Sequence, residues 1–403
     1  KNVNSYRLID VISRGLNPYT DFGKYLSLAE QPEIRFVISN TTEAGIAFDP
    51  QCRLEDRPAS SYPGKLTQLL YHRFKHFDGD MTKGLIIFPC ELIFLNGHKL
   101  REIILQYIDL WQLGDDFKQW FEKACGVYAT LVDRIVPGFP KKDIESIKAR
   151  LGYDDNLVVQ GEAFHLWVIE APESVAEEFP ASRAGLNVLF VPSEKPYHER
   201  KVTLLNGPHT VLSPVAFLSG INIVRDACQH AVVGKYIHRV MYDELMETLD
   251  LPKEELICFA DAVMERFTNP YVDHQLTSIM LNSFSKFATR DLPGLKTYLA
   301  RKNRLPEGLV LGLAAIITYY KGGVRPDGVC YAPQDTPEVL NELKTLWDGR
   351  PLEEVAQGVL AMKTVWNEDL NAIPGLTEQL TRYLQEIADK GMPEVVARLI
   401  NQD

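Results

Sequence analysis

The hydrophobic pattern of the chain changes near residue 200, and this change limits the folds that the chain can adopt. Before it, short continuous apolar runs, such as residues 33–39 and 84–89, alternate with a helical stretch over residues 64–77. Such runs, separated by a helix, are typical of parallel strands that are buried on both faces and joined by crossover helices. After it, long segments with helical apolar spacing follow one another, and prolines stand near their ends.

We therefore predict a mixed α/β domain with a parallel sheet, followed by a mainly helical domain, with the boundary between residues 192 and 201. A chain of 403 residues is long enough to bury a core in each of them. Further strand candidates in the first domain are residues 157–159, 165–170 and 186–191. The expected helices of the second domain cover residues 215–225, 232–249, 254–267, 272–287, 336–347 and 376–400, the last one broken near Pro393.

Composition argues against several classes of partner. The formal net charge is −11, whereas nucleic acids and anionic membranes reward a basic face, so we expect neither as a partner. The six cysteines form no C-x-x-C pair, which indicates neither a zinc site nor a disulfide framework and favours a reducing, cytoplasmic location. No signal peptide is visible, and the longest apolar run, residues 308–320, is too short to span a bilayer. A local basic pocket could still bind a small acidic metabolite.

Lys201, Asn206 and His209 form the strongest candidate for a chemical site, at spacings of five and three residues. On a helix, Asn206 and His209 are neighbours, and Lys201 lies about a turn and a half earlier. A buried lysine can have its pKa lowered enough to transfer protons near neutrality. The amide and the imidazole could stabilise a carbonyl oxygen as it becomes an alkoxide. A surface lysine, a capping asparagine and a core histidine would show the same spacing.

Several motifs, in the same order along the chain, resemble one enzyme family. They are Ser39 to Gly45, Pro89 to Gly97, Thr130 to Pro137 with its Val-Asp-Arg-Ile centre, Lys201-x4-Asn206-x2-His209, and Arg266 to Tyr271. With these motifs the chain resembles the polyol-specific long-chain dehydrogenases, the mannitol dehydrogenase family. The resemblance implies a Rossmann-like NAD-binding domain over residues 1–195 and a helical substrate-binding and catalytic domain over residues 196–403. It also implies an oxidoreductase that uses NAD and no metal.

The resemblance gives the central residues roles. Lys201 is expected to be the general acid and base, and Asn206 and His209 are expected to hold and polarise the substrate oxygen. Asp133 is expected to support the substrate site, although it could instead only form an ion pair with Arg134. The implied reaction is the interconversion of D-tagaturonate and D-altronate in hexuronate breakdown. Fructuronate, mannitol or another polyol is an alternative substrate, and a non-catalytic binding protein is an alternative of a different class.

The nucleotide site is expected to be only partly present. Doubly wound folds bind the cofactor at the carboxyl ends of sheet strands, so Asn40, Thr42 and Glu43 are cofactor-binding candidates. Glu43 could also be no more than the first-turn acid of a helix. No G-x-G-x-x-G occurs, and the glycines within residues 308–312 have the wrong spacing and are expected to pack a helix. The family's glycine-rich turn and ribose-binding acid are therefore expected to precede the first residue, and NAD cannot be told from NADP.

One segment departs from the family. Where the related mannitol enzymes carry a Cys-Asp-Asn sequence, this chain has Cys90-Glu91-Leu92, so the asparagine is missing at that position. Asn96 remains as the candidate for a second hydrogen-bond donor to the substrate.

A polar row in the second domain is the candidate for binding the carboxylate of a sugar acid. Its members recur every four residues along one expected helix, so neighbours in the row share a face. A row that ends in two cations could hydrogen-bond hydroxyl groups and pair with a carboxylate, and Arg266 could assist it. A solvated helix face would look the same. No cluster of His, Cys and Glu has ligand spacing, so no metal is expected. The row consists of His274, Ser278, Asn282, Lys286 and Arg290.

Overall fold

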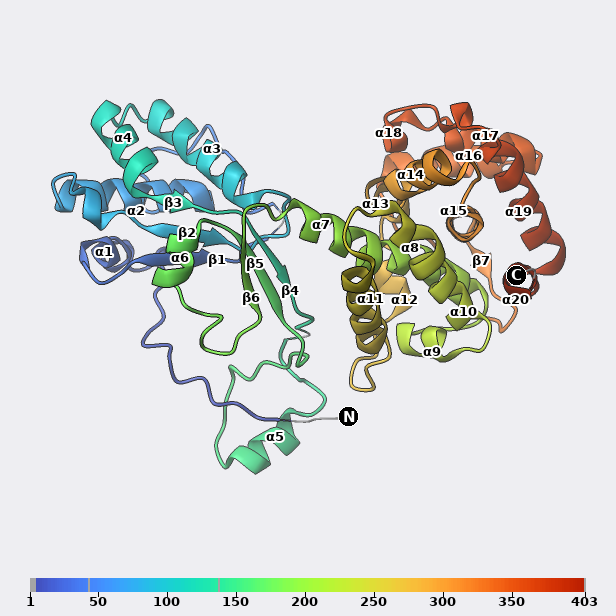
Figure 1. Ribbon diagram of the computed structural model, residues 1–403, viewed down its shortest axis with the longest axis horizontal. Coiled ribbons are helices and arrows are strands. Elements are labelled where there is room, and N and C mark those ends of the chain that lie inside the picture. Colours follow the sequence, from blue (N-terminus) through green and yellow to red (C-terminus); the bar gives the residue numbers. More distant parts are fainter. Residues whose placement is uncertain (1–4, 43, 137, 402–403) are drawn as a thin grey trace. The chain divides into compact units, whose positions relative to one another are not determined.

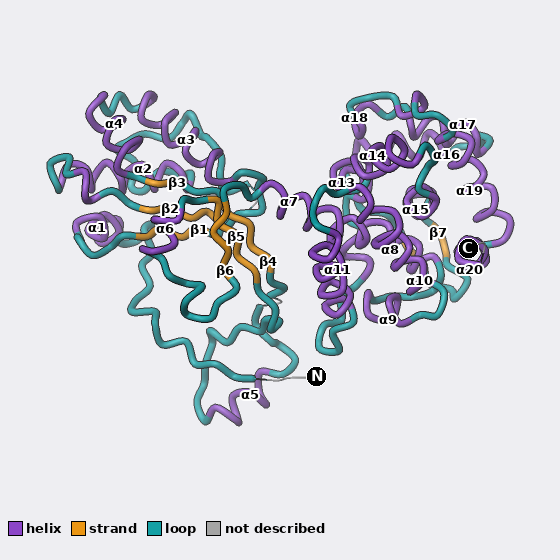
Figure 2. Tube along the Cα trace, viewed as in Figure 1, coloured by secondary structure: helices purple, strands orange, loops and turns teal. Residues whose placement is uncertain are grey.

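The computed structural model describes residues 5–42, 44–136 and 138–401, and the chain forms two compact units, Lys1–Tyr197 and His198–Asp403. The first unit combines strands with helices, and the second consists mainly of helices (Figure 1, Figure 2). The predicted change from an α/β to a mainly helical architecture is confirmed.

The first unit contains two small sheets. In one of them β1 (Phe36–Ser39), β2 (Ile86–Pro89) and β3 (Gly126–Val127) are parallel, in the order β1-β2-β3. In the other, β4 (Thr130–Asp133) is antiparallel to β5 (Leu166–Glu170), which is parallel to β6 (Val188–Val191). The helices of this unit are α1 (Phe22–Ser27), α2 (Tyr62–His76), α3 (Asn96–Leu110), α4 (Asp115–Ala124), α5 (Ile144–Leu151) and α6 (Glu173–Glu178), and η1 (Leu28–Glu30) and η2 (Met81–Lys83) are 3₁₀ turns.

Local sequence explains how these elements form. All four residues of the middle strand β2 are buried, which is why its sequence is a continuous apolar run. Helix α2 begins after Ser61, whose Oγ accepts a hydrogen bond from the Gly64 N–H, and Pro63 fits the first turn. Arg73 of the same helix is buried and joins the surrounding loops. Its guanidinium donates to the backbone carbonyl oxygens of Ala29, Gln31, Ile34 and Lys83.

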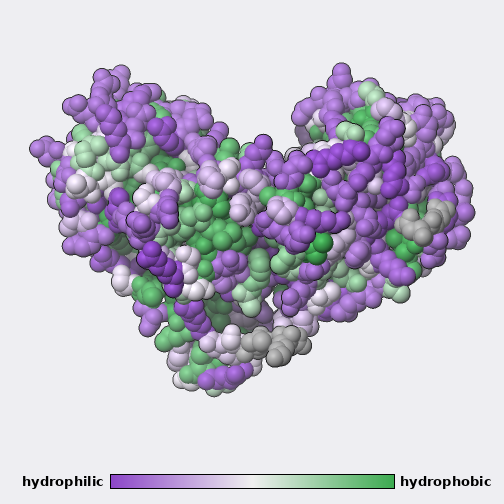
Figure 3. Space-filling view, in the orientation of Figure 1, coloured by the Kyte–Doolittle hydropathy of each residue, from purple (hydrophilic) through white to green (hydrophobic). Residues whose placement is uncertain are grey.

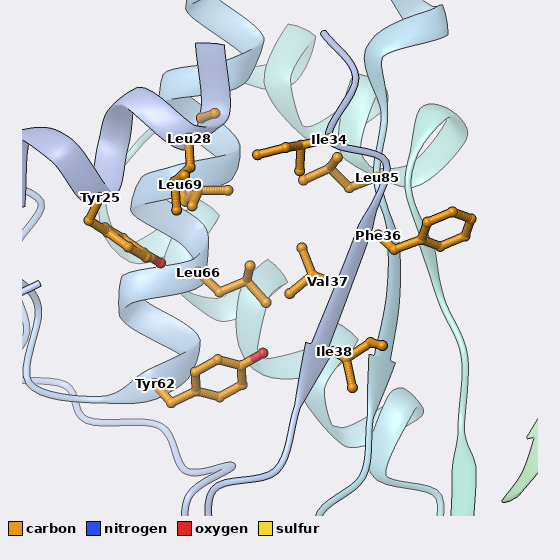
Figure 4. A pocket seen from close by; sticks show the side chains of 11 residues that line it. Tyr25, Leu28, Ile34, Phe36, Val37, Ile38, Tyr62, Leu66, Leu69 and Leu85 are labelled. Atoms are coloured by element: carbon orange, nitrogen blue, oxygen red, sulfur yellow. The ribbon is translucent and has the colours of Figure 1, made fainter. Parts of the chain in front are cut away.

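An apolar cavity of about 340 Å³ lies beside β1, between this strand and the helices α1 and α2 (Figure 4). The side chains of Tyr25, Leu66 and Tyr62 face it from the helices, and Val37 faces it from the strand. Within the described residues β1 pairs with β2 only, so one edge of this strand keeps its backbone groups unpaired. Such an apolar edge is a place where a further strand can pair.

Residues 157–159 do not form a strand, so that prediction is wrong. They lie in the long connection between β4 and β5, and Leu157 and Val159 are largely exposed. No strand of the described chain pairs with them. The apolar side chains of this segment therefore lie on the surface and not in the core. Apolar atoms are visible on the surface around this connection, near α5 (Figure 3).

The second unit is built around a buried helix, α15 (Glu307–Tyr320), which packs against α8 (Gly207–Leu218) and α19 (Leu376–Lys390). A Cβ at Gly312 would lie 2.4 Å from the Cβ of Val211, so this glycine permits the close approach of α15 and α8. The packing role predicted for the glycines of this segment is therefore confirmed.

The remaining helices surround this centre. Among the described residues, no helix is both long and apolar enough to cross a membrane. A short hairpin pairs β7 (Gly323–Val324) with β8 (Cys330–Tyr331). The other elements are α7 (Lys195–Lys201), η3 (Val202–Asn206), α9 (Val224–Gln229), α10 (Val233–His238), η4 (Arg239–Leu245), η5 (Met246–Thr248), α11 (Lys253–Phe267), α12 (Leu276–Ile279), α13 (Ser283–Arg290), α14 (Leu292–Lys302), α16 (Pro337–Trp347), α17 (Leu352–Leu360), α18 (Lys363–Trp366), η6 (Leu370–Ala372) and α20 (Met392–Asn401).

Three of the predicted helices are interrupted by residues in the left-handed conformation. The segment 215–225 contains the end of α8, followed by Gly220 at φ 89°, and the segment 272–287 is broken by Asn282 at φ 53°. The segment 376–400 is broken at Gly391, beside Pro393 where the break was predicted. A left-handed residue cannot continue an α-helix, and glycine and asparagine adopt this conformation most easily.

Candidate functional site

The loop that follows β1 carries the cofactor candidates of the first unit. Asn40 and Thr42 are exposed at the carboxyl end of this parallel strand, where doubly wound folds bind their ligands. Between them, Thr41 is fixed by the buried carboxylate of Glu91, whose Oε1 accepts from the Thr41 backbone N–H at 3.0 Å and from its Oγ1 at 2.8 Å. The third candidate, Glu43, lies outside the described residues.

Asn96 is fully buried at the start of α3, and its side chain connects two strand ends. Its Nδ2 donates to the carbonyl oxygen of Glu91 at 3.0 Å and to that of Thr130 at 2.9 Å. Its Oδ1 accepts from the Thr130 backbone N–H at 2.9 Å. Both amide hydrogens are therefore engaged by the chain itself, and a hydrogen bond from Asn96 to a substrate would have to replace one of these contacts.

Asp133 is the last residue of β4 and is almost fully buried. It pairs in register with Leu166 of β5, so its backbone is held within the sheet. The neighbouring Arg134 donates from Nε to the carbonyl oxygen of Glu162 at 2.9 Å. The sheet thus holds Asp133 in a fixed, desolvated position at the carboxyl end of its strand.

Lys201, Asn206 and His209 lie on one continuous helical run in the second unit. Lys201 is the last residue of α7, Asn206 ends the π-helical turn η3, and His209 is in the first turn of α8. The backbone is helical at Lys201, Asn206 and Gly207, so the chain does not leave the helix between the three elements.

The π-helical turn brings Lys201 toward the side of the helix that carries Asn206. On a regular α-helix, residues five apart point about 140° away from each other. Here the Gly207 N–H donates to the carbonyl oxygen of Val202, five residues earlier, and this wider turn places residues five apart on a similar side. Asn206 and His209, three residues apart, are neighbours as predicted. The three groups can therefore face one reacting carbonyl.

His209 occupies a desolvated position between two rings. Its imidazole stacks on Phe267 with ring centroids 4.0 Å apart, and the ring of His274 meets it edge-on at 5.3 Å. Burial lowers the pKa of His209 well below its ordinary value, and neighbouring cationic side chains lower it further. Its Nε2 has no hydrogen-bond partner within the described chain. A neutral imidazole with an open ring nitrogen is suited to contact a polar substrate.

Three cations from two helices lie near this imidazole. Arg266 lies at the end of α11, and Lys286 and Arg290 lie on α13, all close enough to act electrostatically on His209. Arg290 donates from a terminal nitrogen to the Thr210 Oγ1 at 3.4 Å, and the Lys286 Nζ donates to the carbonyl oxygen of Ile279 at 2.7 Å. A concentration of positive charge beside a neutral histidine is suited to an anionic ligand.

The polar row itself is not a feature of one helix, so that part of the prediction is wrong. His274 precedes α12, Ser278 lies on α12, and Asn282 stands between α12 and α13. The left-handed Asn282 ends any regular four-residue repeat, and its N–H donates to the carbonyl oxygen of Gln334. His274, Lys286 and Arg290 approach His209 through tertiary packing, together with Arg266 from another helix.

Asp291 is a further titratable residue near this site, and no sequence pattern indicated it. It is fully buried, neither carboxylate oxygen has a hydrogen-bond partner in the described chain, and burial raises its pKa well above the ordinary value. A Cβ added to Gly207 would lie 2.9 Å from its Oδ1, so the group sits directly behind the helical run that carries Asn206 and His209. The positive charge of Arg290 acts against this rise but does not outweigh the effect of burial.

His209 is expected to make the stability of the protein depend on pH. In the unfolded chain an imidazole binds a proton below about pH 6.5, whereas the buried one resists it. Its contribution to stability is therefore complete above that pH and is lost as the pH falls, by at most about 1.4 kcal/mol per pH unit. Urea unfolding between pH 7.5 and 5.5 is expected to show a shallower decline for His209→Gln than for the wild type. Replacing the exposed His238 in the same way is expected to leave the decline unchanged, and equal slopes in all three proteins would contradict this role.

In the described part of the chain, no group of three or more His, Cys, Asp or Glu side chains is arranged to hold a metal ion. The six cysteines are unpaired, two of them buried and two exposed.

Both parts of the chain match the models of one protein family. Residues 3–182 match the mannitol dehydrogenase Rossmann domain, and residues 194–388 match the mannitol dehydrogenase C-terminal domain. An altronate oxidoreductase of Bacteroides thetaiotaomicron is 73% identical over 398 residues, which cover 99% of this chain and 83% of that protein. An altronate oxidoreductase of Bacillus subtilis is 46% identical over 393 residues, covering 97% of this chain and 80% of that protein.

Two solved structures share the fold at low sequence identity. Pseudomonas fluorescens mannitol 2-dehydrogenase, in a ternary complex with NAD and D-mannitol, is 22% identical with a TM-score of 0.69, covering 98% of this chain and 80% of that one. A D-sorbitol dehydrogenase in substrate-free form is 20% identical with a TM-score of 0.78, covering 94% of this chain and 78% of that one.

Proposed function

The chain belongs to the mannitol dehydrogenase family, and from this premise we propose that it is a cytoplasmic, NAD-dependent altronate oxidoreductase, also called tagaturonate reductase. It interconverts D-tagaturonate and D-altronate. The observation that carries the proposal is the helical run that aligns Lys201, Asn206 and His209 beside a cluster of cations. The 73% identity with an altronate oxidoreductase over nearly the whole chain supports the choice of substrate.

Lys201 acts as the general acid and base. In the reducing direction its ammonium group gives a proton to the oxygen of the substrate ketone, and in the reverse direction the neutral amine takes the proton of the alcohol. Asn206 and the neutral His209 donate hydrogen bonds to the same oxygen and stabilise the negative charge that develops on it. The π-helical turn supports this division of roles, since it brings residues five apart toward a similar side of the helix.

Arg266, Lys286 and Arg290, with His274, bind the carboxylate of the sugar acid. Charge-assisted hydrogen bonds from these groups orient the substrate and favour a uronate over a neutral sugar. Asp133 and Asn96 of the first unit remain substrate-binding candidates, and a hydrogen bond from Asn96 to a substrate would replace one of its two contacts with the chain.

Asn40, Thr42 and Glu43 hold the nicotinamide cofactor, which supplies or accepts the hydride when bound. The described part of this loop fits the task, because two exposed polar residues follow a parallel strand and the turn between them is fixed by hydrogen bonds. A non-catalytic binding protein is the less favoured alternative, since it has no need of an aligned amine, amide and imidazole.

A substrate panel tests the proposal. With NADH as reductant, the protein is expected to reduce D-tagaturonate with a kcat/KM at least about tenfold above that for D-fructuronate and further above that for D-fructose. The fructuronate comparison separates two sugar acids that share the carboxylate, and the fructose comparison removes the carboxylate. Preference for the neutral ketose would exclude the uronate assignment, and preference for fructuronate would assign the protein to the neighbouring activity.

A further inference from the structure

Glu91 belongs to the segment in which this chain departs from the mannitol enzymes, and its side chain reaches from one strand end to the next. It follows β2 and is 3% exposed. Its Oε2 accepts from the Ser39 hydroxyl at 3.0 Å, and its Oε1 accepts from the backbone N–H and the hydroxyl of Thr41. One carboxylate therefore receives three hydrogen bonds, one from the last residue of β1 and two from Thr41 in the loop that follows.

The backbone around Glu91 is held as firmly as its side chain. The Cys90 N–H donates to the carbonyl oxygen of Ser39 at 2.7 Å and continues the pairing of β1 with β2. The carbonyl oxygen of Glu91 accepts from the buried amide of Asn96. Since the carboxylate starts from a fixed backbone, it gives Thr41 a fixed position, and the exposed neighbours Asn40 and Thr42 are directed by it.

We propose that Glu91 is a positioning residue for cofactor binding, which holds the turn over residues 40–42 in the shape that presents Asn40 and Thr42 to the nicotinamide cofactor. This inference rests on the proposed function. Glu91 acts through Thr41, because its own carboxylate is buried and accepts hydrogen bonds from Ser39 and Thr41. Its role therefore depends on the length of its side chain and on the position of its two acceptor oxygens beside Ser39 and Thr41.

Two conservative variants separate the effect of side-chain length from the effect of charge. Glu91→Asp keeps the charge but is shorter by one carbon–carbon bond, about 1.5 Å, so it cannot keep hydrogen bonds to both Ser39 and Thr41. Glu91→Gln keeps the length, and its carbonyl oxygen can still accept both hydrogen bonds from Thr41. The shorter residue is the one that stands in the related mannitol enzymes, so this comparison also tests why this chain differs there.

The experiment measures NADH binding by nicotinamide fluorescence and the steady-state constants of the same proteins with D-tagaturonate. Glu91→Asp is expected to raise the Kd and KM for NADH about tenfold, the effect of losing charge-assisted hydrogen bonds, with kcat at saturating NADH within about twofold of wild type. Glu91→Gln is expected to stay within about threefold of wild type for all constants. Glu194→Asp, a buried carboxylate of the same unit that binds the Leu95 N–H, is the matched control and is expected to leave NADH binding unchanged.

The hydrogen-exchange rate of the Thr41 amide measures how stably the turn is held in the absence of cofactor. Faster exchange in Glu91→Asp than in Glu91→Gln is expected, and equal exchange overturns the inference. Unchanged NADH binding in Glu91→Asp, or equal losses in both variants, also overturns it. A wild-type protein that neither binds NADH nor reduces D-tagaturonate instead contradicts the proposed function, so the two failures are distinguishable.

Discussion

Replacing Lys201 with alanine is expected to lower kcat for D-tagaturonate reduction by about 10³-fold or more, while the fold and the affinity for NADH remain. Removing a general acid costs about 10²- to 10⁴-fold, and no other amine stands on the same helical run between residues 202 and 218 to replace it. Lys201→Arg is expected to be nearly as inactive, because a guanidinium keeps its charge but does not release a proton near neutrality. Steady-state kinetics and circular dichroism measure the two effects.

The matched control for this prediction is Lys235→Ala, which removes an exposed lysine from α10 of the same unit. It is expected to retain wild-type kinetics. Added ethylamine is expected to restore part of the activity of Lys201→Ala but not of Lys201→Arg, since only the alanine variant has room for a free amine. Turnover near the wild-type rate in Lys201→Ala would remove Lys201 from the proposed mechanism.

Removing either cation of α13 is expected to raise the KM for the sugar acid by about 10- to 100-fold. Lys286→Gln and Arg290→Gln each take away one charge-assisted hydrogen bond to the substrate carboxylate, worth about 1.5–3 kcal/mol. The weak reduction of a neutral ketose, which has no carboxylate, is expected to change much less than the reduction of D-tagaturonate. The measured quantity is the ratio of kcat/KM for the two substrates, which is expected to fall.

Lys296→Gln serves as the control, because this lysine of α14 is partly exposed and pairs with Glu368. It is expected to leave the ratio unchanged. Equal losses for the charged and the neutral substrate would indicate that Lys286 and Arg290 support the structure only. Thermal unfolding of each variant separates that outcome, because a structural role lowers the unfolding temperature together with both activities.

The architecture could be predicted from sequence where the hydrophobic pattern reports burial directly. The run that becomes β2 is apolar at every position because both faces of the middle strand are covered, and the helical spacing after residue 200 reports helices that bury one face. The pattern misled at residues 157–159, where apolar side chains lie on the surface. Apolar residues can be exposed, and only a partner strand makes such a run a strand.

Only part of the candidate site could be predicted from the sequence. The Lys201, Asn206 and His209 motif could be recognised, but the π-helical turn between its members could not, because no local propensity marks such a turn. The polar row anticipated three of the residues near His209 for the wrong reason, since a repeat of four residues does not survive the left-handed Asn282. Asp291 and Phe267 reach the site through tertiary packing, which one sequence does not encode in any local pattern.

The π-helical turn over Val202–Asn206 also accommodates one residue more than an α-helical turn would. Each residue of an α-helix advances the direction of the side chain by about 100°, so one residue more or less between Lys201 and His209 changes their relative phase by that angle. Val202, Thr203, Leu204 and Leu205 can therefore be exchanged for residues of similar shape with little effect on alignment. A single deletion among them would give an ordinary helix, with Lys201 four residues before the asparagine and seven before the histidine, so the three groups would again point to a similar side. The turn therefore compensates for one additional residue, and a regular helix over the same number of residues would point Lys201 about 80° away from His209.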